Sequence, residues 1–211
     1  MRMIQYDSPL MAGINKVVDI FWLSILFAVC CLPIVTIGAS ISALYYTTVK
    51  SLRRNREYVT KTFFHAFRMN LVPSLGMWLF FGGMAVLFYC GFVFAAAIED
   101  SSFRFFVFCV YLFLAFLALG TACYAFPVLS RCSMRCGEIL RFSVGLMVKH
   151  FPYTLLLSLI ALFCVFGIWY FPLFLFCLPS VGSLCYSWFM ERILVRYTPE
   201  SNKESWYMEK G

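Results

Sequence analysis

Long apolar runs separated by short polar connections dominate the pattern of this chain. Three runs, Leu71–Ala97, Phe103–Leu129 and Phe151–Leu178, exceed the length of about 20 residues with which a helix crosses the bilayer core. Lipid offers no hydrogen-bond partner to a free backbone amide, so these runs favour helices. The pattern predicts an all-α, polytopic membrane helical bundle. The shorter runs are Val17–Leu32, which is near the lower limit, and Ile37–Val49 and Val181–Leu194, which are doubtful alone.

The composition supports a membrane protein. Of the 211 residues, 63% are hydrophobic and 13% are charged, whereas a soluble domain has about 25% charged residues. The net charge of +7 does not indicate nucleic-acid binding, because the basic residues flank apolar helices and no zinc-ligand spacing is present. The first apolar run is followed by Pro33-Ile34-Val35-Thr36 and not by a small-residue cleavage site, so we expect a retained helix.

The distribution of basic residues decides between four and six crossings. With six transmembrane helices and both termini cytoplasmic, 16 of the 17 Lys and Arg residues lie inside and only Arg104 lies outside. If the two shortest runs do not cross, the split becomes 10 inside and 7 outside. The positive-inside rule favours six crossings.

Six crossings give three hairpins with longer, basic inner connections. The expected outer turns are Cys31–Gly38, Ile98–Ser102 and Cys177–Gly182. Residues 1–197 then form a single transmembrane domain, and residues 198–211 form a short polar cytoplasmic tail. The first and third outer turns share Cys-Leu-Pro followed by Val and Gly, and this similarity leaves open whether the chain contains an internal repeat.

Small residues recur along the two shortest predicted helices. Proline favours helix ends and glycine permits tight turns or close packing, so Pro33 and Pro179 with Gly38 and Gly182 indicate simple outer turns. Small and hydroxyl side chains let helices approach closely in lipid. We expect a packing seam between the two short helices, with a polar path or ligand pocket as the alternative. Its residues are Thr36, Ser40, Ala43 and Thr47 on one helix and Ser180, Ser183, Ser187 and Glu191 on the other.

Two inner stretches are amphipathic. Phe63, Phe64, Phe67 and Leu71 form one face of the first, and Ile139, Phe142 and Leu146 form one face of the second, opposite Glu138. Such helices usually lie in the headgroup layer with basic groups near anionic lipid. A docking surface for a protein partner is the alternative. The candidates for contact with lipid or a partner are Lys61, His65, Arg68, Arg141 and Lys149.

No group of residues indicates a catalytic site, a metal site or a cofactor. Asp19 and Glu191 lie near the inner ends of their helices, where we expect ordinary anchoring. The ten cysteines form no Cys-x-x-Cys pair, and no local histidine completes a zinc site. Most of the cysteines are expected to act as small apolar side chains. Cys31 and Cys177 share the outer face, where a disulfide is conceivable. We therefore expect no enzyme, and an intramembrane enzyme is the least supported class.

The segment Leu32-Pro33-Ile34-Val35-Thr36-Ile37-Gly38-Ala39, continuing to Ala43-Leu44-Tyr45-Tyr46, resembles the hallmark of the YesL family of small bacterial integral membrane proteins. Asp19 with its apolar helix and the stretch Phe63–Asn70 are similar to the family as well. The first 75 residues carry most of the likeness. The candidates for the family motif and for helix packing are Pro33, Thr36, Gly38, Ser40, Ala43, Tyr45, Pro179, Gly182 and Ser187.

The resemblance implies a bacterial plasma-membrane protein of uncharacterised biochemical function. Family members are often encoded beside ATP-binding-cassette (ABC) sugar importers and polysaccharide-degrading enzymes, which implies a non-enzymatic accessory role in carbohydrate uptake. The expected partners are the lipid bilayer and components of such an importer. The alternative is a small-solute binding or transport protein, because six helices resemble the vitamin-binding subunits of energy-coupling importers. Their small-residue pattern in the first helix is absent from Val17–Leu23.

Overall fold

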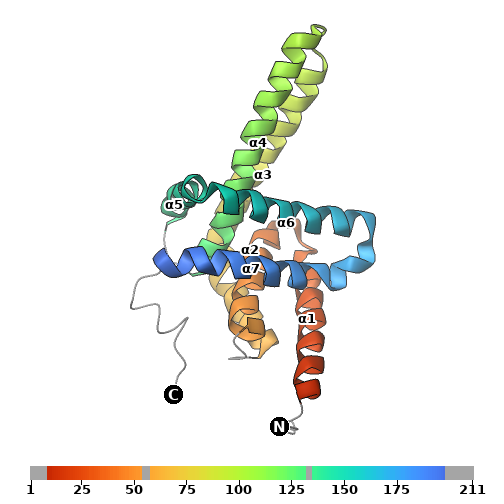
Figure 1. The fold of residues 1–211 in the computed structure, drawn as a ribbon, viewed down its shortest axis with the longest axis vertical. Coiled ribbons are helices and arrows are strands. Elements are labelled where there is room, and N and C mark those ends of the chain that lie inside the picture. The colour runs from red at the N-terminus through yellow and green to blue at the C-terminus, as the bar shows by residue number, and fades with distance from the viewer. Residues whose placement is uncertain (1–8, 54–57, 132–134, 198–211) are drawn as a thin grey trace.

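The computed structural model describes residues 9–53, 58–131 and 135–197, with side chains from residue 13 onward. Within these ranges the regular elements are all helical (Figure 1), as predicted. The predicted tail 198–211 and Arg2 lie outside the described residues. The elements are α1 (Pro9–Cys31), η1 (Ile34–Thr36), α2 (Ile37–Thr47), η2 (Thr48–Arg53), α3 (Val59–Ala96), α4 (Ser101–Leu129), α5 (Cys136–Lys149), α6 (Phe151–Tyr170), η3 (Pro172–Phe176) and α7 (Leu178–Tyr197).

The first hairpin turns where the proline predicts it. Pro33 is extended (φ −76°, ψ 116°) and separates α1 from η1. The hydroxyls of Thr36 and Ser40 donate to the Cys30 carbonyl at 2.7 and 3.1 Å, so they satisfy a backbone acceptor at the end of α1. The turn is shorter than predicted, because α2 begins at Ile37 and therefore includes Gly38.

The second hairpin is longer than the apolar run that predicts it. Helix α3 begins at Val59, before the predicted apolar run that starts at Leu71, and continues through Pro73 to Ala96. The outer turn lies at the predicted place, and the Asp100 side chain accepts a hydrogen bond from the Ser102 amide at 3.1 Å. Figure 1 shows the outer parts of α3 and α4 projecting beyond the other helices.

The third hairpin differs from its prediction. Helix α6 ends at Tyr170 before Pro172, and η3 makes the turn. Pro179 and Gly182 lie inside the first turns of α7, so the predicted outer turn Cys177–Gly182 is wrong. The two Cys-Leu-Pro segments therefore adopt different local structures. Figure 1 shows α6 and α7 side by side and running across the direction of the α3–α4 hairpin.

Four helices in the described part of the chain are long and apolar enough to cross a membrane. They coincide with the four longest predicted runs. Helix α2 has 11 residues, and α7 has 20 residues but contains three charged side chains. The six crossings and the cytoplasmic termini therefore stay predictions. The four candidate spans are Gly13–Cys31, Val59–Ala96, Ser101–Leu129 and Phe151–Tyr170.

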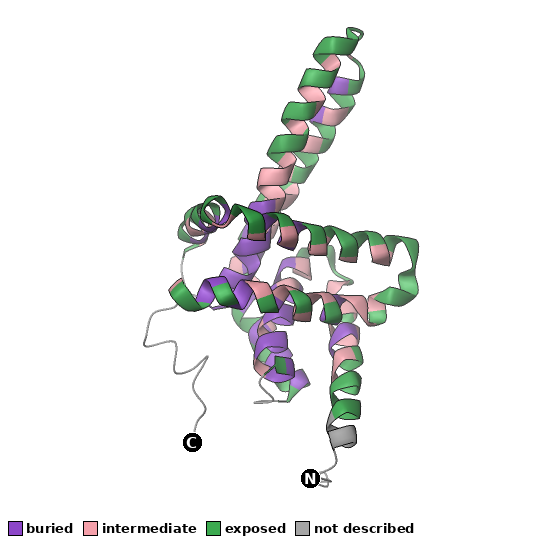
Figure 2. Ribbon diagram, in the orientation of Figure 1, coloured by how far each residue is buried: buried purple, intermediate pink, exposed green. Residues whose placement is uncertain are grey.

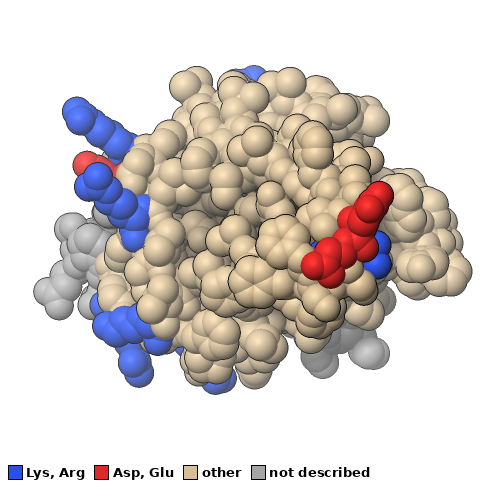
Figure 3. Space-filling view, turned by 90° about the horizontal axis from the view of Figure 1, so that it is seen from above, with Lys and Arg blue, Asp and Glu red and all other residues tan. Residues whose placement is uncertain are grey.

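Buried residues concentrate where α2, the inner parts of α3 and α4, and α7 meet (Figure 2). Tyr124, Met77 and Leu157 are among the largest fully buried side chains there. The outer part of the α3–α4 hairpin is mostly exposed (Figure 2). Seen from above, the surface is largely uncharged, with an acidic spot on one side and basic side chains, with an acidic one among them, along the edge where α5 lies (Figure 3). A surface with so few charges is suited to contact with lipid.

Both amphipathic stretches pack part of their apolar face on protein, and their place in the headgroup layer stays a prediction. Phe63 is fully buried and clusters with Leu23 of α1 and Leu44 of α2. In α5, Ile139 and Leu146 are buried in the cluster that contains residues of α2, α4 and α7. The apolar faces are satisfied because other helices of the chain cover them.

Candidate functional site

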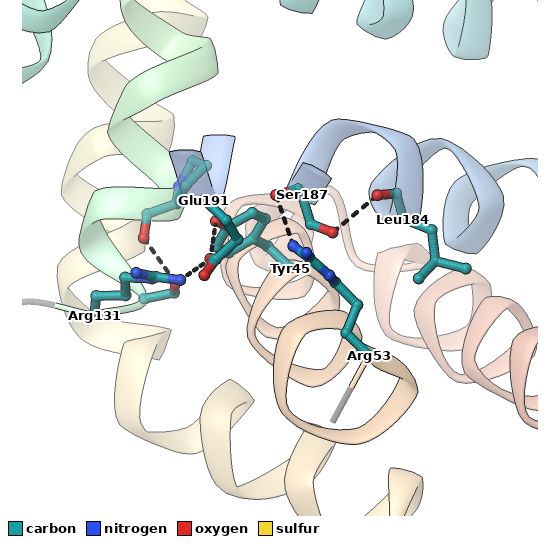
Figure 4. Close-up of polar contacts among 8 residues, drawn as sticks. Tyr45, Arg53, Arg131, Leu184, Ser187 and Glu191 are labelled. Atoms are coloured by element: carbon teal, nitrogen blue, oxygen red, sulfur yellow. Dashed lines mark hydrogen bonds and ion pairs between the residues drawn. The ribbon is translucent and has the colours of Figure 1, made fainter. Parts of the chain in front are cut away.

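A buried ion pair joins the C-terminal end of α4 to α7. Arg131 follows the last turn of α4, and its guanidinium contacts the carboxylate of Glu191 in α7 (Figure 4). The Tyr45 hydroxyl of α2 donates to the same carboxylate at 2.9 Å, and the Tyr45 ring centroid lies 6.0 Å from the guanidinium carbon. Glu191 is only 5% exposed. Three helices thus meet at one charge pair, which we name the Tyr45–Arg131–Glu191 cluster.

A second contact holds α7 beside the cluster. The Arg53 guanidinium at the end of η2 donates to the Ser187 carbonyl at 3.0 Å, and the Ser187 hydroxyl donates to the Leu184 carbonyl at 2.8 Å (Figure 4). Among the described residues, Glu191 Oε2 has no hydrogen-bond partner. The arrangement places two arginines and one carboxylate in the same region. Burial of the carboxylate is costly unless a cationic partner compensates its charge.

Hydroxyl pairs connect α7 to the rest of the first hairpin. Ser24 of α1 donates to Ser180 at 2.7 Å, and Ser183 donates to Thr48 of η2 at 2.9 Å. Helix α7 thus meets α1 and η2 through these pairs and meets α2 through Tyr45. The predicted packing seam between the two short helices stays a prediction.

Small residues of α2 also contact helices other than α7. A Cβ atom on Gly38 would lie 3.1 Å from both the Ser74 carbonyl oxygen and Trp78 Cβ of α3, and 3.2 Å from a ring carbon of Phe126 in α4. Ala43 is fully buried, in the cluster that includes Phe63. Gly38 of α2 therefore packs on α3 and α4, whereas the cluster around Ala43 also includes Leu184 of α7.

Small residues in α7 permit close contact with α6. A Cβ atom on Gly182 would collide with the Cys164 sulfur. Pro179 is buried in the first turn of α7. Cys31 and Cys177 are both free thiols, so the conceivable disulfide between them is not formed.

A pocket of about 320 Å³ lies between two groups of helices. Helices α6 and α7 line one side, and helices α1, α2 and α4 line the other. The hydroxyls of its polar lining residues bond elsewhere: Tyr45 to Glu191, Ser183 to Thr48 and Tyr186 to the Cys123 carbonyl. The pocket therefore presents an apolar surface. The lining includes Phe27, Ile41, Ala122, Ala161, Val165 and Ile168.

The predicted basic contact residues are exposed. Lys61, His65 and Arg68 occupy one exposed face of α3, opposite the buried Phe63, and Arg141 and Lys149 are exposed on α5. The Lys149 ammonium also lies 5.2 Å from the ring centroid of Tyr197. These side chains are accessible to lipid or to a partner.

His150, between α5 and α6, is partly buried. Its burial, together with the charges of Lys149 and Arg196, lowers the pKa of the imidazole. A lowered pKa favours the neutral ring at neutral pH. His150 therefore adds no positive charge to this connection.

The pairing of Arg131 with Glu191 was missed from the sequence. The charge distribution treats Arg131 only as one of the 16 basic residues predicted to lie inside, and the position of Glu191 predicts an anchor at the membrane interface. The available signal was the spacing of Ser180, Ser183, Ser187 and Glu191, which places a carboxylate on the packed face of α7.

The fold and the buried site define an α-helical membrane protein, on the basis of its apolar helices that are long enough to span a bilayer. Residues 17–92 match the family described as "Protein of unknown function, DUF624". The matched segment includes Gly38, Tyr45 and the exposed face of α3. No curated protein and no solved structure matches the chain.

Proposed function

We propose that this chain is a non-enzymatic accessory protein of the bacterial plasma membrane that docks to a component of an ABC-type sugar importer. The importer is suggested by the resemblance of Leu32–Ala39 to the YesL family. The observation that carries the docking role is the exposed basic face of α3. Lys61, His65 and Arg68 lie there beside the exposed Phe64 and Met69, a mixture of aromatic and cationic groups suited to a protein surface.

The placement of polar side chains supports binding over catalysis. The Tyr45–Arg131–Glu191 cluster and the Ser24–Ser180 pair hold helices together. These polar groups are engaged in internal contacts, and the hydroxyl of Tyr45, whose ring lines the pocket, bonds to Glu191. This engagement supports a binding role over a catalytic one.

Charge reversal of the α3 face tests the proposal. We expect Lys61→Glu with Arg68→Glu to reduce copurification of an importer permease or ATPase about tenfold, because two attractive contacts become repulsive. The measurement is quantitative mass spectrometry after purification from native membranes, together with sugar uptake. The matched control is Lys61→Arg with Arg68→Lys, which keeps both charges. Unchanged copurification and uptake in the reversed variant would refute docking through this face.

We also propose the six-crossing topology with both termini in the cytoplasm. It is supported by the charge distribution, which places 16 of 17 basic residues inside. Helix α2 continues into η2, so the helical segment Ile37–Arg53 is longer than α2 alone.

Cysteine labelling tests this topology. In a chain with its native cysteines replaced, we expect a cysteine at Arg104 to react with a membrane-impermeant maleimide in intact cells. Cysteines at Lys16 and Arg141 should react only after the cells are opened, because both lie on the inner side. External labelling at Lys16 would contradict six crossings.

The second candidate function is small-solute binding, which the pocket of about 320 Å³ favours. Its volume is at the lower end of the range of about 300–1,000 Å³ for ligand pockets. The engaged hydroxyls of Tyr45, Ser183 and Tyr186 make it better suited to an apolar solute than to a sugar.

A further inference from the structure

We propose that the pocket between α2, α4, α6 and α7 binds one acyl chain of a membrane lipid. The inference rests on the second candidate function, solute binding, and names the ligand class. It is independent of docking to an importer.

The pocket is hollow because small side chains line it. Ala122 of α4 and Ala161 of α6 leave space that larger side chains would fill. Val165 also lines the pocket and is 64% exposed, so the pocket reaches the outer surface of α6. Helix α6 is one of the candidate membrane spans, and its exposed side chains face lipid chains in a bilayer. A lipid chain therefore has direct access.

The chemistry of the lining selects hydrocarbon. Sugars need several hydrogen-bond partners, and an unmade bond to a buried polar group is costly. The Tyr45, Ser183 and Tyr186 hydroxyls already donate to other groups of the protein. The rest of the lining is almost entirely apolar. A polar solute would leave its own groups unsatisfied in this pocket, whereas an acyl chain has none to satisfy.

Filling the pocket with a chain is favoured over leaving it empty. Apolar cavities exclude water, and the atoms that line an empty cavity lose dispersion contacts. With about 320 Å³ the pocket has room for part of one acyl chain, and its apolar lining offers no partner for a polar headgroup. The rings of Tyr45 and Tyr186 meet edge to face at 6.3 Å and form a rigid part of the wall. The headgroup then remains outside, at the membrane surface.

Photolabelling of the intact protein tests the proposal. The protein is reconstituted in phosphatidylglycerol vesicles that contain phosphatidylglycerol with a diazirine on one acyl chain, and labelled residues are mapped by mass spectrometry. We expect labels on the buried Cys123 and Phe126 of α4, which a chain reaches only through the pocket. Ala161→Trp, which fills the pocket, should reduce this labelling about tenfold. Leu162→Trp, at the adjacent exposed position of α6, should leave it unchanged.

The possible results distinguish failure of the proposed ligand, an acyl chain, from failure of solute binding itself. Labels confined to exposed residues such as Leu162 in the wild-type protein would overturn the proposal, and this result requires no variant to fold. Labelling by a diazirine fatty acid but not by the phospholipid would overturn the choice of a membrane lipid. If a sugar or vitamin stabilises the protein against heat and displaces the label, solute binding stands and the acyl chain is wrong. If no solute binds and Cys123 stays unlabelled, both fail.

Discussion

Glu191→Ala is expected to lower the free energy of unfolding by about 3–5 kcal/mol, the cost of breaking a buried ion pair. The variant leaves the Arg131 guanidinium buried without its carboxylate and removes the acceptor of the Tyr45 hydroxyl. Because the pair joins α4 to α7, we expect α7 to separate from the bundle first. The measurement is denaturant unfolding in detergent, followed by tryptophan fluorescence.

Two further variants make this prediction specific. Glu99→Ala, which removes an exposed carboxylate at the outer turn, should change the free energy of unfolding by less than about 0.5 kcal/mol. Replacing both charges, as in Arg131→Met with Glu191→Leu, should recover part of the loss, because no unpaired charge then remains. A Glu191→Ala variant as stable as Glu99→Ala would show that the pair does not hold α7.

Gly38→Leu is expected to destabilise the protein by about 1–3 kcal/mol, as overpacking of a close helix contact does. Even a Cβ atom at this position would be 3.1 Å from the backbone oxygen of Ser74, which cannot rotate away as a side chain can. Helices α2 and α3 would have to move apart. Thermal unfolding of the purified protein, monitored by circular dichroism, measures the effect.

Gly82→Leu is the matched control for Gly38→Leu. Gly82 lies in α3, and a Cβ atom there has no neighbouring atom within 4 Å. We expect the stability of Gly82→Leu to remain close to that of the wild-type protein, because the side chain extends into open space. Equal losses in the two variants would mean that the effect is a general response to replacing glycine in a membrane helix.

Hydropathy alone predicted the all-helical fold and the positions of the four longest apolar helices. These features follow from one local requirement, that a backbone in lipid must bond to itself. The turn at Pro33 was also predicted correctly. Pro33 has an extended backbone before a new helix, and the fixed φ angle of proline permits this conformation. The start of α3 was not predicted, because the helix begins at Val59, before the apolar run that starts at Leu71, and continues through Pro73.

The sequence determined which side of each amphipathic stretch is apolar, and the tertiary structure decided what covers that side. Phe63 and Ile139 could equally have faced lipid, since lipid and protein interiors are both apolar and produce the same pattern. Likewise, the sequence placed Glu191 on a helix with Ser187, but its partner Arg131 belongs to another helix. Only the packing of α2, α4 and α7 brings the two charges together, because a buried carboxylate needs a cation that chain folding must supply.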